Sequence, residues 1–192
     1  QTMGHLPVNM EALDIDFVAA SAHKFHGPKG VGVLYINAAI QIKPIIAGGA
    51  QERNMRAGTE NLYGIVGFAK ALELANLSQA EDSKYIQELK NYMYEKLCST
   101  FGDVKTNGDT FGNSLYTVLN VSFPKTEKSE LILFNLDMAG ICVSGGSACS
   151  SGTTSISHVI QALNPHEVEA WIPIRFSFCK NNTKGEIDFV VQ

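Results

Sequence analysis

A lysine in a polar, glycine-containing segment is the first residue that could do chemistry. Lys24 lies in SAHKFHGPKG, residues 21–30, directly after an apolar run at 14–20 that predicts a buried strand. Open α/β sheets bind ligands beyond the carboxyl ends of their strands. A buried lysine at such a place has a lowered pKa, so its amine can form a Schiff base with a carbonyl compound. The alternative is a solvated loop lysine, which is the common case for a lysine taken alone.

A cysteine among small residues is the second candidate. Cys149 lies in SGGSACSSG, residues 144–152, where glycine and serine predict an accessible thiol that can react as a thiolate. Composition alone leaves equally open a loop cysteine without function. Cys98 and Cys142 lie in apolar patterns and are predicted to be small core residues, whereas the role of Cys179 stays open. The sequence has no CxxC pair, so neither a zinc site nor a disulfide framework is indicated.

An arginine inside a strand-like alternation is the third candidate. Arg175 lies in IPIRFSF, residues 172–178, whose apolar positions predict a side that faces a core. Arg175 would then project from the opposite side, where its planar guanidinium suits a carboxylate. Because surface arginines are common, the pattern alone does not separate this role from that of an ordinary exposed side chain.

These residues need structural elements to position them, and the first group of elements lies in residues 1–76. Apolar runs predict strands at 14–20 and 31–36, with the lysine segment between them. A second glycine-rich connection, at 47–61, leads into an apolar helical stretch. This part of the chain therefore predicts α/β structure.

The second group, in residues 77–192, predicts a small α+β domain. The capping box formed by Ser78 and Glu81 predicts the start of a helix. Its apolar residues recur every three or four positions and predict one buried stripe: Ile86, Leu89, Met93 and Leu97. The other predicted elements are a strand at 115–123, a helix at 129–138, a strand at 141–144, two short helices within 156–172, a strand at 174–178 and a helix that begins at a second capping box, Thr183 and Glu186.

Composition narrows the class of protein. The chain has 192 residues, of which 45% are hydrophobic and 18% charged, as in a soluble globular protein. Its net charge of −4 predicts no direct nucleic acid partner. The apolar runs are far shorter than the roughly 20 residues of a membrane helix, so we expect a cytoplasmic protein with no membrane partner. Glutamine at position 1, and a helix that only begins near the other end, lead us to expect that both ends are cuts in a longer protein.

Three motifs, taken together and in this order, resemble the cysteine desulfurases: SAHKFHGPKG at 21–30, QERNMRAGT at 51–59 and GSACS at 146–150. These proteins are class V members of the fold-type I enzymes, which use pyridoxal 5'-phosphate. The resemblance extends over the whole chain but corresponds to the second half of a family member. It implies an α/β fold in which residues 1–76 are the carboxyl-terminal portion of the cofactor-binding large domain and residues 77–192 are the small α+β domain with the cysteine loop.

The resemblance also implies roles for individual residues. Lys24 would bind the cofactor covalently and move the α-proton of the substrate, Cys149 would accept sulfur, and Arg175 would bind the substrate carboxylate. The other implied cofactor ligands are Ser21 and His23 at the phosphate, Gln1 at the phenolic oxygen, and Thr59 at the phosphate of the neighbouring subunit's cofactor. The aspartate that pairs with the pyridinium nitrogen would lie three residues before Gln1, outside this chain. The resemblance implies no metal.

The implied reaction converts L-cysteine to L-alanine and leaves a persulfide on Cys149. A homodimer would then pass the sulfur to an acceptor protein, such as an iron–sulfur scaffold. Two alternatives stay open. Another class V enzyme, such as an aminotransferase or a selenocysteine lyase, would share Lys24 and Arg175 but need no mobile thiol. A catalytically idle fragment would act only as a structural or interaction module, and the yellow colour of cofactor bound to Lys24 would argue against it.

Overall fold

The structure of the chain is a computed structural model that describes residues 1–127, 129–145, 157–166 and 169–192. The chain divides into two compact units, residues 1–80 and 81–192, and each unit is described by itself. The sequence predicted a boundary after Asn76, whereas the structure divides after Ala80.

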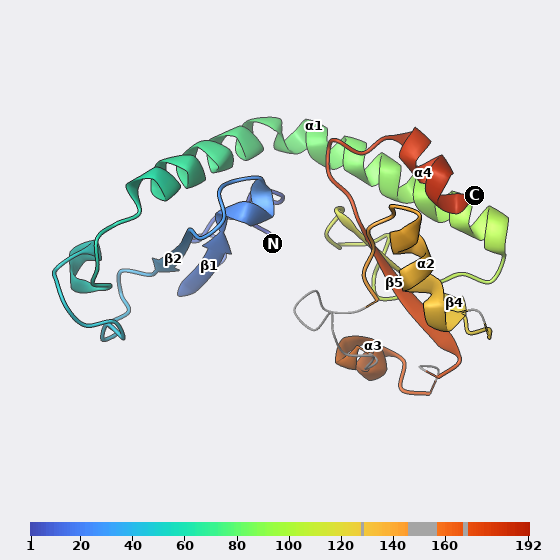
Figure 1. Cartoon of the computed structure of the whole chain (residues 1–192). Coiled ribbons are helices and arrows are strands. Elements are labelled where there is room, and N and C mark those ends of the chain that lie inside the picture. The colour runs from blue at the N-terminus through green and yellow to red at the C-terminus, as the bar shows by residue number, and fades with distance from the viewer. Residues whose placement is uncertain (128, 146–156, 167–168) are drawn as a thin grey trace. The chain divides into compact units, whose positions relative to one another are not determined.

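The first unit contains a two-stranded antiparallel sheet (Figure 1). Strand β1, Phe17–Ser21, pairs with β2, Gly32–Ile36, and the 3-10 turn η1, Ala22–Phe25, follows β1 directly. Both predicted strands are present, but the prediction that they are buried is wrong, since the Leu34 side chain is 56% exposed. A two-stranded ribbon covers neither of its own faces, so apolar side chains that alternate along it stay open to solvent.

One continuous helix, α1, spans Leu62–Phe101 and contains the boundary between the two units (Figure 1). The predicted helix start at Ser78 is wrong, because the Ser78 hydroxyl donates to the Leu74 carbonyl inside this helix at 3.2 Å. Alanine, leucine and glutamate flank Ser78 on both sides, and these strong helix formers carry the helix through. The predicted stripe is confirmed, with at most 3% of each side chain exposed: Ile86, Leu89, Met93 and Leu97.

The second unit is built on an antiparallel sheet of three strands in the order β3–β4–β5 (Figure 1). The strands are β3, Lys105–Thr106, β4, Val118–Pro124, and β5, Trp171–Ser177. Leu119 lies opposite Phe176, and Val121 lies opposite Ile174, so these four side chains share one face of the sheet. All four are buried.

That face forms the core of the second unit together with two helices. Helix α1 contributes Leu89, Met93 and Leu97, and helix α4, Lys184–Val191, contributes Ile187 and Val191. Each fully buried side chain of this kind stabilises the fold by about 2 kcal/mol. The core therefore fixes the inner face of the sheet, and the residues between the core positions belong to the outer face.

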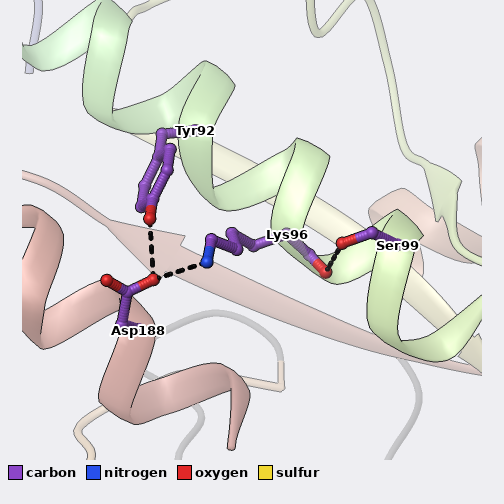
Figure 2. Close-up of polar contacts among 4 residues, drawn as sticks. All are labelled: Tyr92, Lys96, Ser99 and Asp188. Carbon is purple, nitrogen blue, oxygen red and sulfur yellow. Dashed lines mark hydrogen bonds and ion pairs between the residues drawn. The ribbon is translucent and has the colours of Figure 1, made fainter.

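Helix α4 begins as the sequence predicts and is held on α1. The Thr183 hydroxyl accepts from the Glu186 backbone at 3.2 Å, and the Glu186 carboxylate accepts from the Thr183 backbone at 2.8 Å, which confirms the capping box. Figure 2 shows that Asp188 of α4 accepts from the Tyr92 hydroxyl at 2.7 Å and pairs with Lys96 at 2.9 Å. These contacts join two elements that are far apart in the sequence.

The remaining described elements are short. They are η2, Glu52–Asn54, η3, Ser129–Leu131, α2, Ile132–Met138, and α3, His158–Leu163. The helix predicted at 129–138 corresponds to η3 and α2. Of the two helices predicted within 156–172, the described residues contain α3, and β5 already begins at Trp171. Within the described part of the chain, no helix combines the length and apolar character needed to cross a membrane.

The strand predicted at 141–144 is wrong, because Ser144 alone makes a ladder contact, an isolated bridge to Arg175. Val143 packs against the core and the adjacent Cys142 is exposed, so the prediction that Cys142 is a core residue is also wrong. Neighbouring residues of an extended segment point to opposite sides, and Val143 occupies the inner side. Cys98 and Cys179 are both half-buried.

Candidate cofactor and substrate site

Lys24 lies on the turn η1, which holds two of its residues inward and two outward. A 3-10 turn repeats every three residues, so Ala22 and Phe25 share its buried side. The Phe25 ring packs edge-on against Phe68 of α1, with ring centroids 5.2 Å apart. His23 and Lys24 are the exposed residues of the turn. Burial of Phe25 therefore anchors the turn and displays the imidazole and the amine.

The segment after Lys24 is held close to α1 by glycines. The Gly27 backbone donates to the Ala22 carbonyl at 2.9 Å, and a Cβ at position 27 would lie 3.1 Å from the Cβ of Ala71. A Cβ at Gly67 of α1 would lie 2.9 Å from Cγ of Pro28. Larger residues at either glycine would push the segment away from the helix, which explains the glycine at position 27.

Ser21 is fixed by the strand ladder at the end of β1. It pairs with Gly32 of β2, where a Cβ would lie 2.6 Å from the Ala20 carbonyl oxygen, so the two strands approach closely at this end. Ser21 is half-buried. Gln1 and Thr59 are both exposed.

The segment before Thr59 contains a left-handed turn. Glu52, Arg53 and Asn54 have φ angles of 47°, 58° and 66°, a region that residues with a Cβ rarely adopt. The Gln51 side chain accepts from the Gly58 backbone at 3.1 Å and closes the loop across its base. Strain of this kind is found where the surrounding structure needs a particular backbone path.

Arg175 lies in the middle of β5, on the sheet face opposite the core. Its neighbours Ile174 and Phe176 are buried in the core, so the alternation of the strand directs Arg175 to the other face. Its backbone N–H donates to the Ser144 carbonyl at 2.7 Å, and its carbonyl accepts from the Ser144 N–H at 3.2 Å. On the other side of β5, Arg175 lies opposite Asn120 of β4.

Sequence reasoning missed a polar network on this outer face. Asn107 donates from Nδ2 to Oδ1 of Asn120 at 2.9 Å and to Oγ of Ser122 at 2.8 Å. The Asn107 Oδ1 accepts from Nδ2 of Asn164 at 3.2 Å. The signal was present in the alternation of VLNVSFP, where Asn120 and Ser122 occupy the positions between buried residues. The adjoining cavity of about 70 Å³ is smaller than an ordinary ligand pocket of about 300 Å³ or more.

The structure thus brings Ser21, His23 and Lys24 together at one end of β1. Arg175 belongs to the other unit. Cys149 lies outside the described residues. In the part of the chain that the structure describes, no group of three histidine, cysteine or acidic side chains is placed to hold a metal ion.

Comparison with known proteins decides the family. The model of the aminotransferase class-V family matches residues 1–190. The chain belongs to the class V aminotransferase family. The cysteine desulfurase IscS of Dictyoglomus turgidum is 44% identical over 191 residues, which cover 100% of this chain and 48% of the relative. The cysteine desulfurase of Gluconacetobacter diazotrophicus is 40% identical and is covered to 47%.

Two solved structures share the fold of this chain. A NifS-like protein superposes with a TM-score of 0.85 at 38% identity, over 100% of this chain and 48% of that one. A NifS-like protein from Rickettsia africae superposes with a TM-score of 0.83 at 32% identity, over 98% of this chain and 49% of that one. The chain therefore spans about half the length of the relatives that it matches.

The residues of the η1 turn fit the cofactor that the family resemblance implies. Pyridoxal phosphate carries an aldehyde and a phosphate dianion. Lys24 supplies an amine that can add to an aldehyde, while the Ser21 hydroxyl and the His23 imidazole can donate hydrogen bonds to a phosphate. All three groups lie within four consecutive residues, one half-buried and two exposed. The donor set present on this class V chain therefore matches both functional groups of the cofactor.

Proposed function

We propose that this chain is the carboxyl-terminal half of a pyridoxal phosphate-dependent cysteine desulfurase. The observation that carries the proposal is the η1 turn, which displays Lys24 and His23 directly beyond Ser21. Support also comes from the identity to named cysteine desulfurases, 44% and 40% along the whole chain. In the proposed arrangement, residues 1–76 are part of the cofactor-binding large domain and residues 77–192 form the small domain.

The proposed reaction uses L-cysteine and one enzyme thiol. The thiolate of Cys149 attacks the substrate sulfur, an S–S bond forms, and the C–S bond breaks. The electron pair of that bond stays on the β-carbon, which takes up a proton to complete L-alanine. The product on the enzyme is a persulfide, so atoms and electrons balance without an external oxidant or reductant. The bound cofactor supplies the electron-withdrawing ring that makes the α-proton acidic.

Each proposed site residue has a task that suits its chemistry. The Lys24 amine receives the α-proton and returns a proton, as a general base and acid. Ser21 and His23 bind the cofactor phosphate, and Gln1 binds its phenolic oxygen. The Arg175 guanidinium binds the substrate carboxylate through two parallel hydrogen bonds.

The proposed enzyme has two kinds of protein partner, a second copy of itself and a sulfur acceptor. Two copies of the full-length protein form a homodimer, in which Thr59 of one subunit binds the cofactor phosphate of the other. An acceptor protein, such as an iron–sulfur scaffold, takes the persulfide sulfur in the cytoplasm. The exposure of Thr59, at the end of a strained and internally bonded loop, supports a contact outside its own chain.

The test uses the full-length protein with bound cofactor. Incubation with L-cysteine should yield L-alanine, and intact mass followed by peptide mapping should place one added sulfur on Cys149. Cys149→Ala should abolish both products while the yellow colour of the bound cofactor remains. Cys142→Ala, which removes an exposed thiol outside the proposed site, is the matched control and should keep full activity. Alanine formation by Cys149→Ala at the normal rate would reject the persulfide step and favour another class V activity.

A further inference from the structure

A row of polar residues crosses the outer face of the sheet in the second unit. Asn107, Asn120, Arg175 and Ser144 follow one another across four adjacent segments. Residues in one such row project from the same face. This is the face opposite the core, so all four side chains belong to the side on which Arg175 lies.

Asn120 and Arg175 are an especially close pair in this row. The backbone of Arg175 bonds to Ser144, and the carbonyl of Asn120 accepts from the Asn107 backbone at 2.9 Å. Both backbones therefore direct their hydrogen bonds away from each other. Such a non-hydrogen-bonded pair of an antiparallel sheet has its Cα atoms about 4.5 Å apart and its side chains closer than in the hydrogen-bonded pairs.

The hydrogen bonds around Asn107 determine which atom of the Asn120 amide can contact a ligand. Its Oδ1 accepts from Asn107 on the β3 side. The two ends of a carboxamide diverge from Cγ, so the Nδ2 donors of Asn120 point away from the Asn107 amide and stay available to a ligand on this face. Asn107 itself is held by Ser122 and Asn164. Two neighbours thus hold the amide of Asn107, which in turn orients the amide of Asn120.

Asn120 and Arg175 are paired across the sheet, and among the described residues neither the Asn120 Nδ2 nor the Arg175 guanidinium donates to an acceptor. The guanidinium of Arg175 has donors only, and the Nδ2 of Asn120 is also a donor, so neither can accept from the other. An anion with two oxygens satisfies both groups at once. A carboxylate accepts up to about four hydrogen bonds, more than an arginine fork alone provides.

We propose that Asn120 is a second binding residue for the α-carboxylate of the amino acid substrate, and that Asn107 is its positioning residue. This inference rests on the proposed function of Arg175. It predicts that recognition of the carboxylate is shared between β4 and β5, and that Asn107 affects it only through Asn120.

The experiment compares a ligand that has the carboxylate with one that lacks it. L-Alanine and L-alaninamide are titrated into the full-length protein with bound cofactor, and the change in cofactor absorbance gives each Kd. Asn120→Ala should weaken L-alanine about tenfold, the loss of one hydrogen bond to a charged group, and leave L-alaninamide unchanged. Asn107→Ala should give a smaller loss, again for L-alanine alone. Asn91→Ala, at an exposed position of α1, is the control.

Kinetics supply a second measurement. Asn120→Ala should raise KM for L-cysteine about tenfold and change kcat by less than about twofold, as expected when ground-state and transition-state binding are lost equally. Asn120→Ser serves if the melting temperature shows that the alanine variant does not fold. Equal weakening of L-alanine and L-alaninamide, or no weakening of either, would overturn the inference. A wild-type protein that forms no alanine would instead reject the proposed function, and the two titrations would still report on the carboxylate site.

Discussion

Lys90 is a buried lysine of the second unit. Its side chain is 1% exposed on α1, and its Nζ donates to the Ser114 hydroxyl at 3.3 Å. Burial lowers the pKa of Lys90, and the charge of Asp109 offsets only part of this effect. The ammonium therefore weakens the folded state at neutral pH.

We expect Lys90→Met to raise the melting temperature of the full-length protein at pH 7, because methionine fills similar space without a charge. The lowered pKa also determines how the stability of the wild-type protein changes with pH. Between that pKa and the ordinary value of 10.5, the unfolded state binds more protons, so wild-type stability rises with pH. The advantage of Lys90→Met should therefore shrink between pH 7 and pH 10. Lys84→Met, at an exposed position of the same helix, controls for charge, and an equal gain there would contradict this explanation.

Asp188, which contacts Tyr92 and Lys96 in Figure 2, makes the stability of the folded state depend on pH in the acid range. The hydrogen bond from Lys96, and then that from Tyr92, lowers the pKa of this carboxyl below 3.8. Its contribution to stability is present above that value and is lost as pH falls through the lowered pKa.

We expect Asp188→Asn to make unfolding less sensitive to acid. Melting temperatures measured from about pH 5 to about pH 2 should fall less steeply in this variant than in the wild type. Asp103→Asn, which changes an exposed carboxyl outside this contact, is the comparison. Parallel curves for the wild type and Asp188→Asn would show that the contact does not couple to folding.

At the scale of elements, α1 has a buried and an exposed portion in one continuous helix. Leu89 is 0% exposed in the core of the second unit, whereas Leu77 is 77% exposed. We expect Leu89→Ala to destabilise the protein by about 3 kcal/mol, since it leaves a cavity. Leu77→Ala should change stability by about 0.5 kcal/mol or less, as at other surface positions. Urea unfolding measures both, and equal effects would mean that helix propensity, not packing, sets the stability of α1.

The two capping boxes show what the sequence could and could not predict at this scale. Thr183 and Glu186 form theirs, because extended backbone precedes the helix and leaves its first N–H groups unpaired. The same pattern at Ser78 fails, because the residues before Ser78 already belong to helix α1 and supply backbone acceptors for its N–H groups. The local sequence pattern predicted the strands next to Lys24 and Arg175. The pairing of Asn120 with Arg175 depends on the register of β4 and β5, which a single sequence does not determine.

At the scale of the molecule, the described part of the chain exposes several large apolar side chains. In the first unit Ile45 is 99% exposed and Tyr63 is 90% exposed. Apolar surface of this kind marks contacts with other chains or segments. The chain also spans about half the length of its relatives, as expected for a part of a family member.

We therefore expect the 192-residue chain, expressed alone, to self-associate and to bind pyridoxal phosphate weakly. Sedimentation velocity should detect oligomers that the full-length protein does not form, and the chain should lose its yellow colour on dialysis. The full-length protein treated in the same way should stay yellow. A monomeric chain that retains the cofactor would contradict the proposed dependence on the other half.

The left-handed run at Glu52, Arg53 and Asn54 bears on how this protein would respond to selection for heat tolerance. Glycine adopts this backbone without the steric cost that a Cβ imposes, so a change to glycine at one of these positions is among the simplest stabilising mutations open to the chain. If the turn serves only to close the loop before Thr59, laboratory evolution at rising temperature should accept it. Repeated rejection would show that these side chains are retained for a task that outweighs their strain.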